Sequence, residues 1–163
     1  MKLAVFTGSF DPVTLGHVDI MRRASGLFEE LNVCVIGNPQ KHAMFSVEDR
    51  MEMIRLAAEG ACLNNVTVSS YNGMAAHYAL SVGASYIVRG LRNQADFGYE
   101  TNMETYNRML APMVETVYLS CPPELMHISS SGVRELIHYG ADIGTLVPDR
   151  INKYVSERLK NDE

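Results

Sequence analysis

The chain has 163 residues, of which 47% are hydrophobic and 20% charged, and its formal net charge is −5. This length predicts one domain over residues 1–163, with a core large enough to fold without metal or disulfide staples. The acidic balance excludes a sequence-independent nucleic-acid binder, which is normally basic, but it is compatible with a small anionic ligand in a basic pocket.

Apolar runs and helical periodicities alternate along the chain. Val- and Ile-rich runs without strict polar alternation predict strands buried on both faces, at residues 3–6, 32–36, 66–68, 86–88 and 116–119. Apolar residues spaced three and four apart predict helices, at residues 18–31, from Ser46 onward, and at 74–82, 96–110, 130–139 and 151–159. This order predicts an α/β fold with a five-stranded parallel sheet, helices on both faces and a C-terminal helical tail.

The cysteines and the hydropathy pattern bear on the compartment. Cys34, Cys62 and Cys121 are widely spaced and form no Cys-x-x-Cys pair, so neither a zinc site nor a disulfide framework is predicted. No apolar run approaches the roughly 20 residues of a membrane span, and the apolar start is too short for a signal peptide. We therefore expect a cytoplasmic protein with no membrane or nucleic-acid partner.

Polar or glycine-containing segments follow every predicted strand, at residues 7–12, 38–41, 70–73, 89–92 and 129–132. In an open parallel sheet, ligands bind beyond the carboxyl ends of the strands. Glycines, hydroxyls and cations that converge on this edge predict an anion site of the kind that binds phosphate.

His17 ends the segment Thr14-Leu15-Gly16-His17 at the expected start of the first helix. The helix dipole there favours negative charge, and a His can hydrogen-bond phosphate oxygens as charge builds in a transition state. A lone His is more often structural. Its position beyond the first strand, close to the Gly8 and Ser9 turn, favours the catalytic interpretation.

Three cations also follow strands. A basic loop residue such as Lys41 is usually a solvated surface charge, but Arg89 directly follows a buried run and Arg92 comes three residues later. Two guanidinium groups at this spacing suit forked contacts to phosphate. The three serines at 129–131 come just before Gly132 at the start of an expected helix, so that one can cap it while the others contact phosphate.

Asp96 and Glu100 are four residues apart and therefore share a helix face. They could act as acid and base, bind ribose hydroxyls or simply solvate the helix. The remaining histidines are scattered, and no Walker loop, Gly-x-Gly-x-x-Gly or Gly-x-Ser-x-Gly motif is present.

The Gly-Ser-Phe-Asp-Pro segment at 8–12, followed by the Thr-Leu-Gly-His segment, resembles the signature of the Thr/His-x-Gly-His nucleotidylyltransferases. Within them, the chain resembles the bacterial phosphopantetheine adenylyltransferases. Further motifs carry this narrower resemblance: Asn38-Pro39-Gln40-Lys41, Arg89-Gly90-Leu91-Arg92, Asp96-Phe97-Gly98-Tyr99-Glu100, Asn107-Arg108, Glu115-Thr116 and Ile128-Ser129-Ser130-Ser131.

The resemblance implies a Rossmann-like fold and the transfer of the adenylyl group of ATP to 4′-phosphopantetheine. The acceptor phosphate would attack the ATP α-phosphate in line, giving dephospho-coenzyme A and pyrophosphate. The resemblance also implies Mg²⁺ held mainly by substrate phosphates and water rather than by protein ligands, and a homohexamer. Coenzyme A is a candidate feedback ligand.

Site residues are implied in the same way. His17 would stabilise the transition state, with Lys41 and Arg92 as further catalytic residues. The residues implied for the ATP site are Ser9, Phe10, His17, Gly90, Leu91, Arg92, Glu100, Leu125, Met126, His127, Ile128, Ser129, Ser130 and Ser131. Those implied for the phosphopantetheine site are Ser9, Lys41, Ala75 and Arg89.

Some positions depart from the family pattern. Thr7 stands where Pro is common, Gly98 where Glu is usual, and Leu125 and His127 where larger apolar or aromatic side chains are frequent. A helical Gly costs up to about 1 kcal/mol relative to Ala, so we expect the helix from Asp96 to be loosened.

Two alternatives remain open. A sibling nucleotidylyltransferase would use nicotinamide mononucleotide or a sugar or polyol phosphate as acceptor, which the Arg-Gly-Leu-Arg segment disfavours. A nucleotide-sensing module would bind ATP or coenzyme A without turnover, which the presence of His17, Lys41 and Arg92 disfavours.

Overall fold

The computed structural model describes residues 2–37 and 42–161. In this part of the chain, five strands form one all-parallel sheet in the order β3-β2-β1-β4-β5. The strands are β1 (Leu3–Gly8), β2 (Glu30–Ile36), β3 (Val66–Tyr71), β4 (Tyr86–Leu91) and β5 (Glu115–Ser120). The predicted Rossmann-like α/β class is confirmed.

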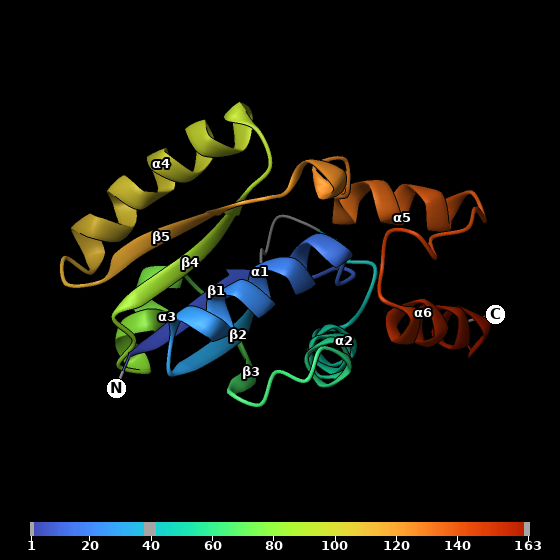
Figure 1. The fold of residues 1–163 in the computed structure, drawn as a ribbon, viewed down its shortest axis with the longest axis horizontal. Helices are drawn as coiled ribbons and strands as arrows, with labels where there is room; N and C mark the ends of the chain where they lie inside the picture. The colour runs from blue at the N-terminus through green and yellow to red at the C-terminus, as the bar shows by residue number, and fades with distance from the viewer. Residues whose placement is uncertain (1, 38–41, 162–163) are drawn as a thin grey trace.

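Helices connect the strands and complete the chain (Figure 1). They are α1 (Leu15–Leu27), α2 (Val47–Gly60), α3 (Ala75–Ser81), α4 (Gln94–Leu110), the 3₁₀ turn η1 (Pro123–Leu125), α5 (Ser130–His138) and α6 (Asp149–Asn161). Figure 1 shows α4 beside β5 on one side of the molecule, with α5 and α6 together at the opposite end. None of the helices in the described residues combines the length and apolarity needed to cross a bilayer.

The strands separate two apolar cores, because successive side chains of a strand point to opposite faces. In β1, Ala4 and Phe6 belong to the core that α1, α2 and α6 cover. Leu3 and Val5 belong to the second core, which contains residues of α3. Burial on both faces explains why the strand runs lack polar alternation.

The first helix differs from its prediction. The chain leaves α1 at Phe28, whose backbone is extended, and Leu31 already pairs with Ala4 in the sheet. The apolar residues Phe28 and Leu31 continue the helical spacing only because both pack into the same core. The helix also begins earlier, since Thr14 is its N-cap.

Several strands run further than their apolar cores predict. In β1, Thr7 and Gly8 continue the ladder with Cys34 and Val35, and β4 extends through Arg89 to Leu91 alongside β5. Backbone pairing does not require an apolar side chain, so these polar residues remain in the sheet. The strands therefore carry functional groups on their last, rigidly held residues.

The helical tail is an integral part of the fold. Ile151 and Val155 of α6 are buried in the core beside α2, and the Tyr154 hydroxyl donates to Asp49 Oδ1 at 2.8 Å. Ser46 caps α2 as predicted, and Asp49 completes a capping box with it. All three cysteines are free.

Candidate active site

A cavity of about 1040 Å³ opens at the carboxyl ends of the strands. The sheet order reverses between β1 and β4, which is where an open parallel sheet forms its ligand crevice. Segments after all five strands reach its wall, which comprises residues 6–11, 14, 16, 17, 20, 35–37, 42, 43, 47, 50, 70–72, 89–92, 96, 100, 121, 128–131 and 134. Of the loops that the sequence analysis placed at one edge, those at 7–12, 70–73, 89–92 and 129–132 contribute residues to this cavity, and residues 38–41 lie outside the described residues.

His17 is held rigidly at this cavity. The Thr14 backbone N–H donates to His17 Nδ1 at 3.0 Å, and the His17 N–H donates to Thr14 Oγ1 at 3.4 Å, so the ring itself completes the cap of α1. The Phe10 ring packs against it with centroids 4.9 Å apart. Since Nδ1 accepts a hydrogen bond, the neutral ring carries its proton on Nε2.

The charge of His17 is set by its surroundings. Burial, followed by the positive charges of Arg92 and Arg89, lowers the pKa of His17 to about 4. The ring is therefore neutral at pH 7. It can donate a hydrogen bond from Nε2, but it does not add a positive charge to the cavity.

The turn after β1 is held by a buried aromatic ring. Phe10 is fully buried and has a positive φ of 49°. A Cβ added at Gly8 would lie 3.2 Å from that ring, so a glycine is favoured there. The predicted ATP contact of Phe10 is thus restricted to its backbone, because its side chain lies inside the core.

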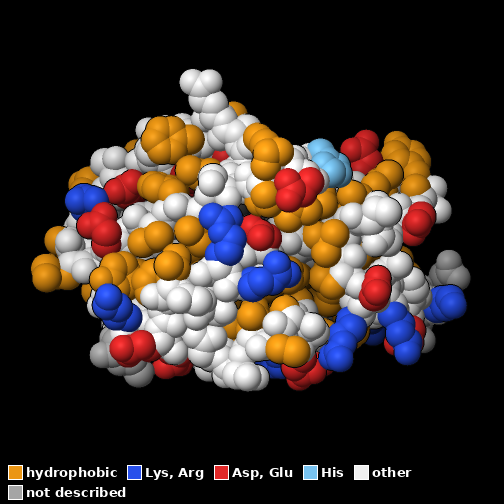
Figure 2. All heavy atoms as spheres, in the orientation of Figure 1, with side chains coloured by type: hydrophobic (Ala, Val, Ile, Leu, Met, Phe, Trp, Pro, Cys, Tyr) orange, Lys and Arg blue, Asp and Glu red, His pale blue; other side chains and the backbone are white. Residues whose placement is uncertain are grey.

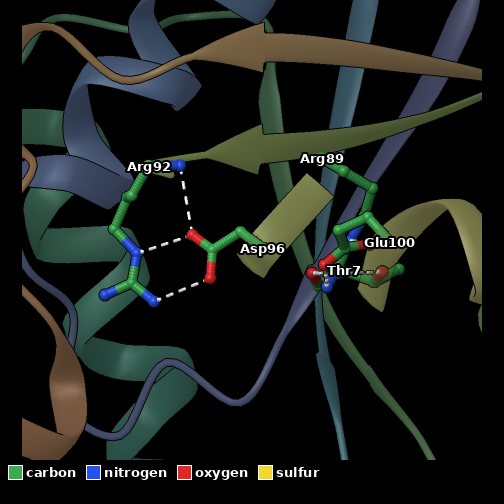
Figure 3. A network of polar contacts seen from close by, with 5 residues as sticks. All are labelled: Thr7, Arg89, Arg92, Asp96 and Glu100. Atoms are coloured by element: carbon green, nitrogen blue, oxygen red, sulfur yellow. Dashed lines mark hydrogen bonds and ion pairs between the residues drawn. The ribbon is translucent and has the colours of Figure 1, made fainter. Parts of the chain in front are cut away.

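Arg89 is engaged by a carboxylate (Figure 3). Its Nε donates to Glu100 Oε2 at 2.8 Å and its Nη2 to Glu100 Oε1 at 2.6 Å. Its Nη1 donates to the Thr7 carbonyl and, at 3.2 Å, to Thr7 Oγ1. The fork that the sequence analysis assigned to phosphate lies on Glu100 in this structure.

Arg92 makes an equivalent pair with Asp96 (Figure 3). The Arg92 backbone N–H and Nε both donate to Asp96 Oδ2 at 3.1 Å, and Nη1 reaches the Ile128 carbonyl at 3.2 Å. Asp96 and Glu100 therefore lie on one face of α4, as expected, but each serves here as an arginine partner. None of the three roles considered from the sequence included this one.

The serines at the start of α5, the N-cap Ser129 and the first helical residues Ser130 and Ser131, also reach the cavity wall. Ser129 Oγ accepts from the Gly132 N–H at 3.1 Å, which confirms that one serine caps this helix. Ser130 Oγ donates to the Pro12 carbonyl at 2.8 Å, and Ser131 Oγ accepts from Arg134 Nη2 at 3.2 Å.

The structure brings most of the implied site residues together, but not all. Those on the cavity wall are Ser9, Phe10, His17, Arg89, Gly90, Leu91, Arg92, Glu100, Ile128, Ser129, Ser130 and Ser131. Those off the wall are Ala75, which packs against the second core, and Leu125, Met126 and His127, which lie in and after η1. Lys41 lies outside the described residues, so its role stays a prediction.

Sequence reasoning missed three charged residues at this cavity. Asp11 accepts hydrogen bonds from the Met44 and Phe45 backbone N–H groups at 2.9 Å each, which ties the segment after β2 to the turn after β1. Arg134 donates to the Asp11 carbonyl at 2.7 Å. Arg50 donates to the Ser9 carbonyl at 3.0 Å. Only Asp11 had a signal, its place in the glycine-rich motif.

The carboxylates of the wall are already occupied by protein partners. Asp11 binds backbone amides, and Asp96 and Glu100 bind arginines. Among residues 2–37 and 42–161, no group of three or more His, Cys, Asp or Glu could hold a metal ion. This donor set fits a Mg²⁺ ion that is held by phosphate oxygens and water, the ligands it prefers.

Comparison with known proteins agrees with this geometry. The cytidylyltransferase-like family model matches residues 5–136. The phosphopantetheine adenylyltransferase of Limosilactobacillus reuteri is 42% identical over 163 residues, covering 100% of this chain and 93% of that protein. The one from Streptococcus equi subsp. zooepidemicus is 44% identical over 164 residues, covering 99% and 97%.

A solved structure supports the fold. The putative nicotinate-nucleotide adenylyltransferase of Vibrio parahaemolyticus superposes with a TM-score of 0.67 at 22% identity, covering 96% of this chain and 93% of that one. At this identity the likeness concerns the fold alone. The family match and the full-length similarity to the curated relatives show that the chain belongs to the phosphopantetheine adenylyltransferase family of cytidylyltransferase-like proteins.

Proposed function

We propose that this chain transfers the adenylyl group of ATP to 4′-phosphopantetheine, giving dephospho-coenzyme A and pyrophosphate. One observation carries the proposal beyond family membership. A neutral, rigidly held His17 shares a single cavity with arginines at the switch point of the sheet. Such a cavity binds phosphate groups and stabilises charge that moves between them.

The reaction needs no protein base. The acceptor phosphate is already an anionic nucleophile, and one of its oxygens attacks the α-phosphorus of ATP in line. A new P–O bond forms as the bond to the bridging oxygen breaks, and the electron pair leaves with pyrophosphate. Catalysis then rests on positioning the two substrates and stabilising the charge that develops.

His17 stabilises the transition state in this mechanism. Its Nε2–H is free to donate to an oxygen of the reacting phosphates, because Nδ1 is occupied by the Thr14 N–H. A lowered pKa keeps the ring neutral at pH 7, so that Nδ1 stays an acceptor and Nε2 carries the proton. A fixed donor of this kind costs no reorganisation when the reaction occurs.

The arginines bind substrate phosphates. We assign Arg89, with Ser9 and Lys41, to the acceptor and Arg92, with Ser129 and its neighbours, to ATP. The partly exposed pairs of Arg89 with Glu100 and of Arg92 with Asp96 can exchange a carboxylate for a phosphate as substrates arrive. The roles implied for Ala75, Leu125, Met126 and His127 stay predictions.

Mg²⁺ belongs to this proposal as a substrate-bound cofactor. Bound between phosphate oxygens and water, it would neutralise charge on the triphosphate.

Coenzyme A is proposed as a feedback ligand of the same cavity, since it contains both the nucleotide and the pantetheine of the product. The site of action is proposed to be the cytoplasm.

A homohexamer is proposed as the assembly. No residue of α4 is buried in the monomer, and large apolar side chains on and just after it are exposed, namely Phe97, Tyr99, Tyr106, Met109, Leu110 and Met113. Figure 2 shows hydrophobic side chains at the surface on the side of α4 and β5. A surface of this kind suits contacts with further copies, and light scattering should return the mass of six chains.

A pyrophosphate-release assay with ATP, Mg²⁺ and a panel of acceptors tests the activity. We expect turnover with phosphopantetheine and background rates with nicotinamide mononucleotide, sugar phosphates and polyol phosphates. The matched control omits the acceptor and measures ATP hydrolysis alone. Turnover with nicotinamide mononucleotide in place of phosphopantetheine would overturn the proposal.

A further inference from the structure

Arg50 is a buried cation at the cavity wall. It lies in α2, four residues after the Ser46 cap, and only 6% of its surface is exposed. Its Nε donates to the Ser46 carbonyl at 3.2 Å and its Nη1 to the Ser9 carbonyl at 3.0 Å. Nη2 has no hydrogen-bond acceptor within residues 2–37 and 42–161, although Arg50 lines the cavity.

Within the part of the chain that the structure describes, no carboxylate balances the charge of Arg50. The other arginines of the wall are paired, Arg89 with Glu100, Arg92 with Asp96, and Arg134 with Asp11 at 3.7 Å. No carboxylate of the described residues lies within ion-pair distance of Arg50.

Two features make this unbalanced charge costly. Arg50 lies near the start of α2, the positive end of the helix dipole. The neighbouring Asp49 is occupied by Ser46, Tyr154 and Arg158. A buried cation without an anionic partner is unfavourable, so an anion that enters the cavity would relieve it.

We infer that Arg50 binds a phosphate group of a bound substrate through Nη2, the guanidinium nitrogen that has no acceptor among the described residues. This inference rests on the proposed function for the identity of the substrates. Its position against the Ser9 carbonyl places it at the turn that both substrates are proposed to share. The phosphate comes from ATP or from the acceptor, and the two sources are separated by experiment.

A purely structural role would require the hydrogen-bond donors of Arg50, whereas phosphate binding also requires its positive charge. Two contacts to carbonyls require donors but no charge. Arg50→Gln keeps a donor and removes the charge, whereas Arg50→Lys keeps the charge and loses the fork. Arg55→Gln is the matched control, because Arg55 lies on the same helix, is exposed and pairs with Glu52 at 3.0 Å.

The test measures melting temperature and steady-state kinetics of the full chain. For Arg50→Gln without ligand, we expect a melting temperature equal to or above that of the wild type. The increase caused by ATP, inorganic pyrophosphate or phosphopantetheine should shrink for the ligand that Arg50 contacts. The KM for that substrate should rise about tenfold to a hundredfold, with a smaller change in kcat, and Arg50→Lys should retain most of the binding.

The substrate whose KM rises identifies the source of the phosphate. The inference is overturned if Arg50→Gln lowers the melting temperature or fails to fold, or if its ligand-induced increases and both KM values match the wild type. Equal losses in Arg50→Gln and Arg50→Lys would overturn it too. The melting-temperature increase caused by ATP alone requires neither an acceptor nor turnover. The inference about Arg50 can therefore fail while the proposed activity stands, and the proposed activity can fail while Arg50 still binds the phosphate of ATP.

Discussion

The two walls of the cavity are built differently. On the α1 wall, four residues of the helix are buried, and His17 is fixed by Thr14 and Phe10. On the α4 wall, no helix residue is buried, and the helix reaches the cavity through two ion pairs, Glu100 with Arg89 and Asp96 with Arg92.

This difference matches the two tasks that we propose for the site. A group that stabilises a transition state must be fixed before the reaction, which a packed helix start achieves. Groups that capture and release substrates must exchange partners, which partly exposed ion pairs allow. Elements with few buried contacts also open at lower free energy than the core, so we expect α4 to be the more mobile wall.

Removing the fixed donor should have the largest effect. We expect His17→Ala to lower kcat by about 10²-fold or more, since one preorganised transition-state contact is lost. His17→Gln, which can still donate a hydrogen bond, should recover part of that loss. Steady-state kinetics decide the point. An unchanged kcat with only a higher KM for ATP would remove His17 from transition-state stabilisation.

The pH dependence of stability tests how tightly the α1 wall surrounds His17. The pKa of His17 is about 4 in the folded chain and 6.5 ordinarily. Below pH 6.5 the unfolded chain therefore binds a proton that the folded chain does not, and the unfolding free energy decreases as the pH is lowered. Between pH 7 and 5, the wild type should lose about 2 kcal/mol of unfolding free energy more than His17→Gln. Parallel urea titrations at the two pH values measure this difference, and identical losses would mean that the ring is not held neutral.

Arg89→Lys tests the α4 wall, whose ion pairs are proposed to exchange partners when substrates bind. Lysine cannot reproduce the fork to Glu100 and the contact to Thr7. We expect KM for phosphopantetheine to rise about tenfold and KM for ATP to change less. Arg108→Lys is the control, since that exposed arginine of α4 pairs with Glu104 and Glu115 away from the cavity. Equal effects of both substitutions would argue against a specific acceptor contact.

The smallest expected effect concerns the stiffness of α4. The helix is unbroken through Gly98, which is exposed, and an added Cβ would meet nothing within 4 Å. Gly98→Ala should therefore raise the unfolding free energy by up to about 1 kcal/mol. Chemical denaturation measures the change, and Gly26→Ala in α1, where the Cβ also meets nothing, is the matched control. A destabilised Gly98→Ala would show that the glycine is required where it lies.

Sequence reasoning located the elements and the loops of the site, because apolar periodicity and post-strand glycines are local signals. It extended the first helix to Leu31, which belongs to β2. An apolar residue is required at a core position on a helix and on a strand alike, so the apolar spacing did not distinguish the two. It could not pair Arg89 with Glu100, because that contact depends on how α4 returns over β4.

The cation at position 50 shows the same limit more strongly. A lone arginine on an amphipathic helix is normally read as a solvated charge, and nothing local marks Arg50 as buried. Its burial follows from the contact between the start of α2 and the turn after β1, which Asp11 holds through Met44 and Phe45. Residues of this kind are recognised only once the fold is known.

The central claim is that the acceptor phosphate attacks the ATP α-phosphate in this cavity, and an isotope measurement tests it most directly. The wild-type chain is incubated with ATP, Mg²⁺ and phosphopantetheine whose phosphate oxygens are labelled with ¹⁸O. Mass spectrometry then measures the masses of the products and so locates the label. The account predicts that dephospho-coenzyme A retains the label of the acceptor phosphate and that pyrophosphate is unlabelled. Label in pyrophosphate, or pyrophosphate without labelled dephospho-coenzyme A, would contradict it.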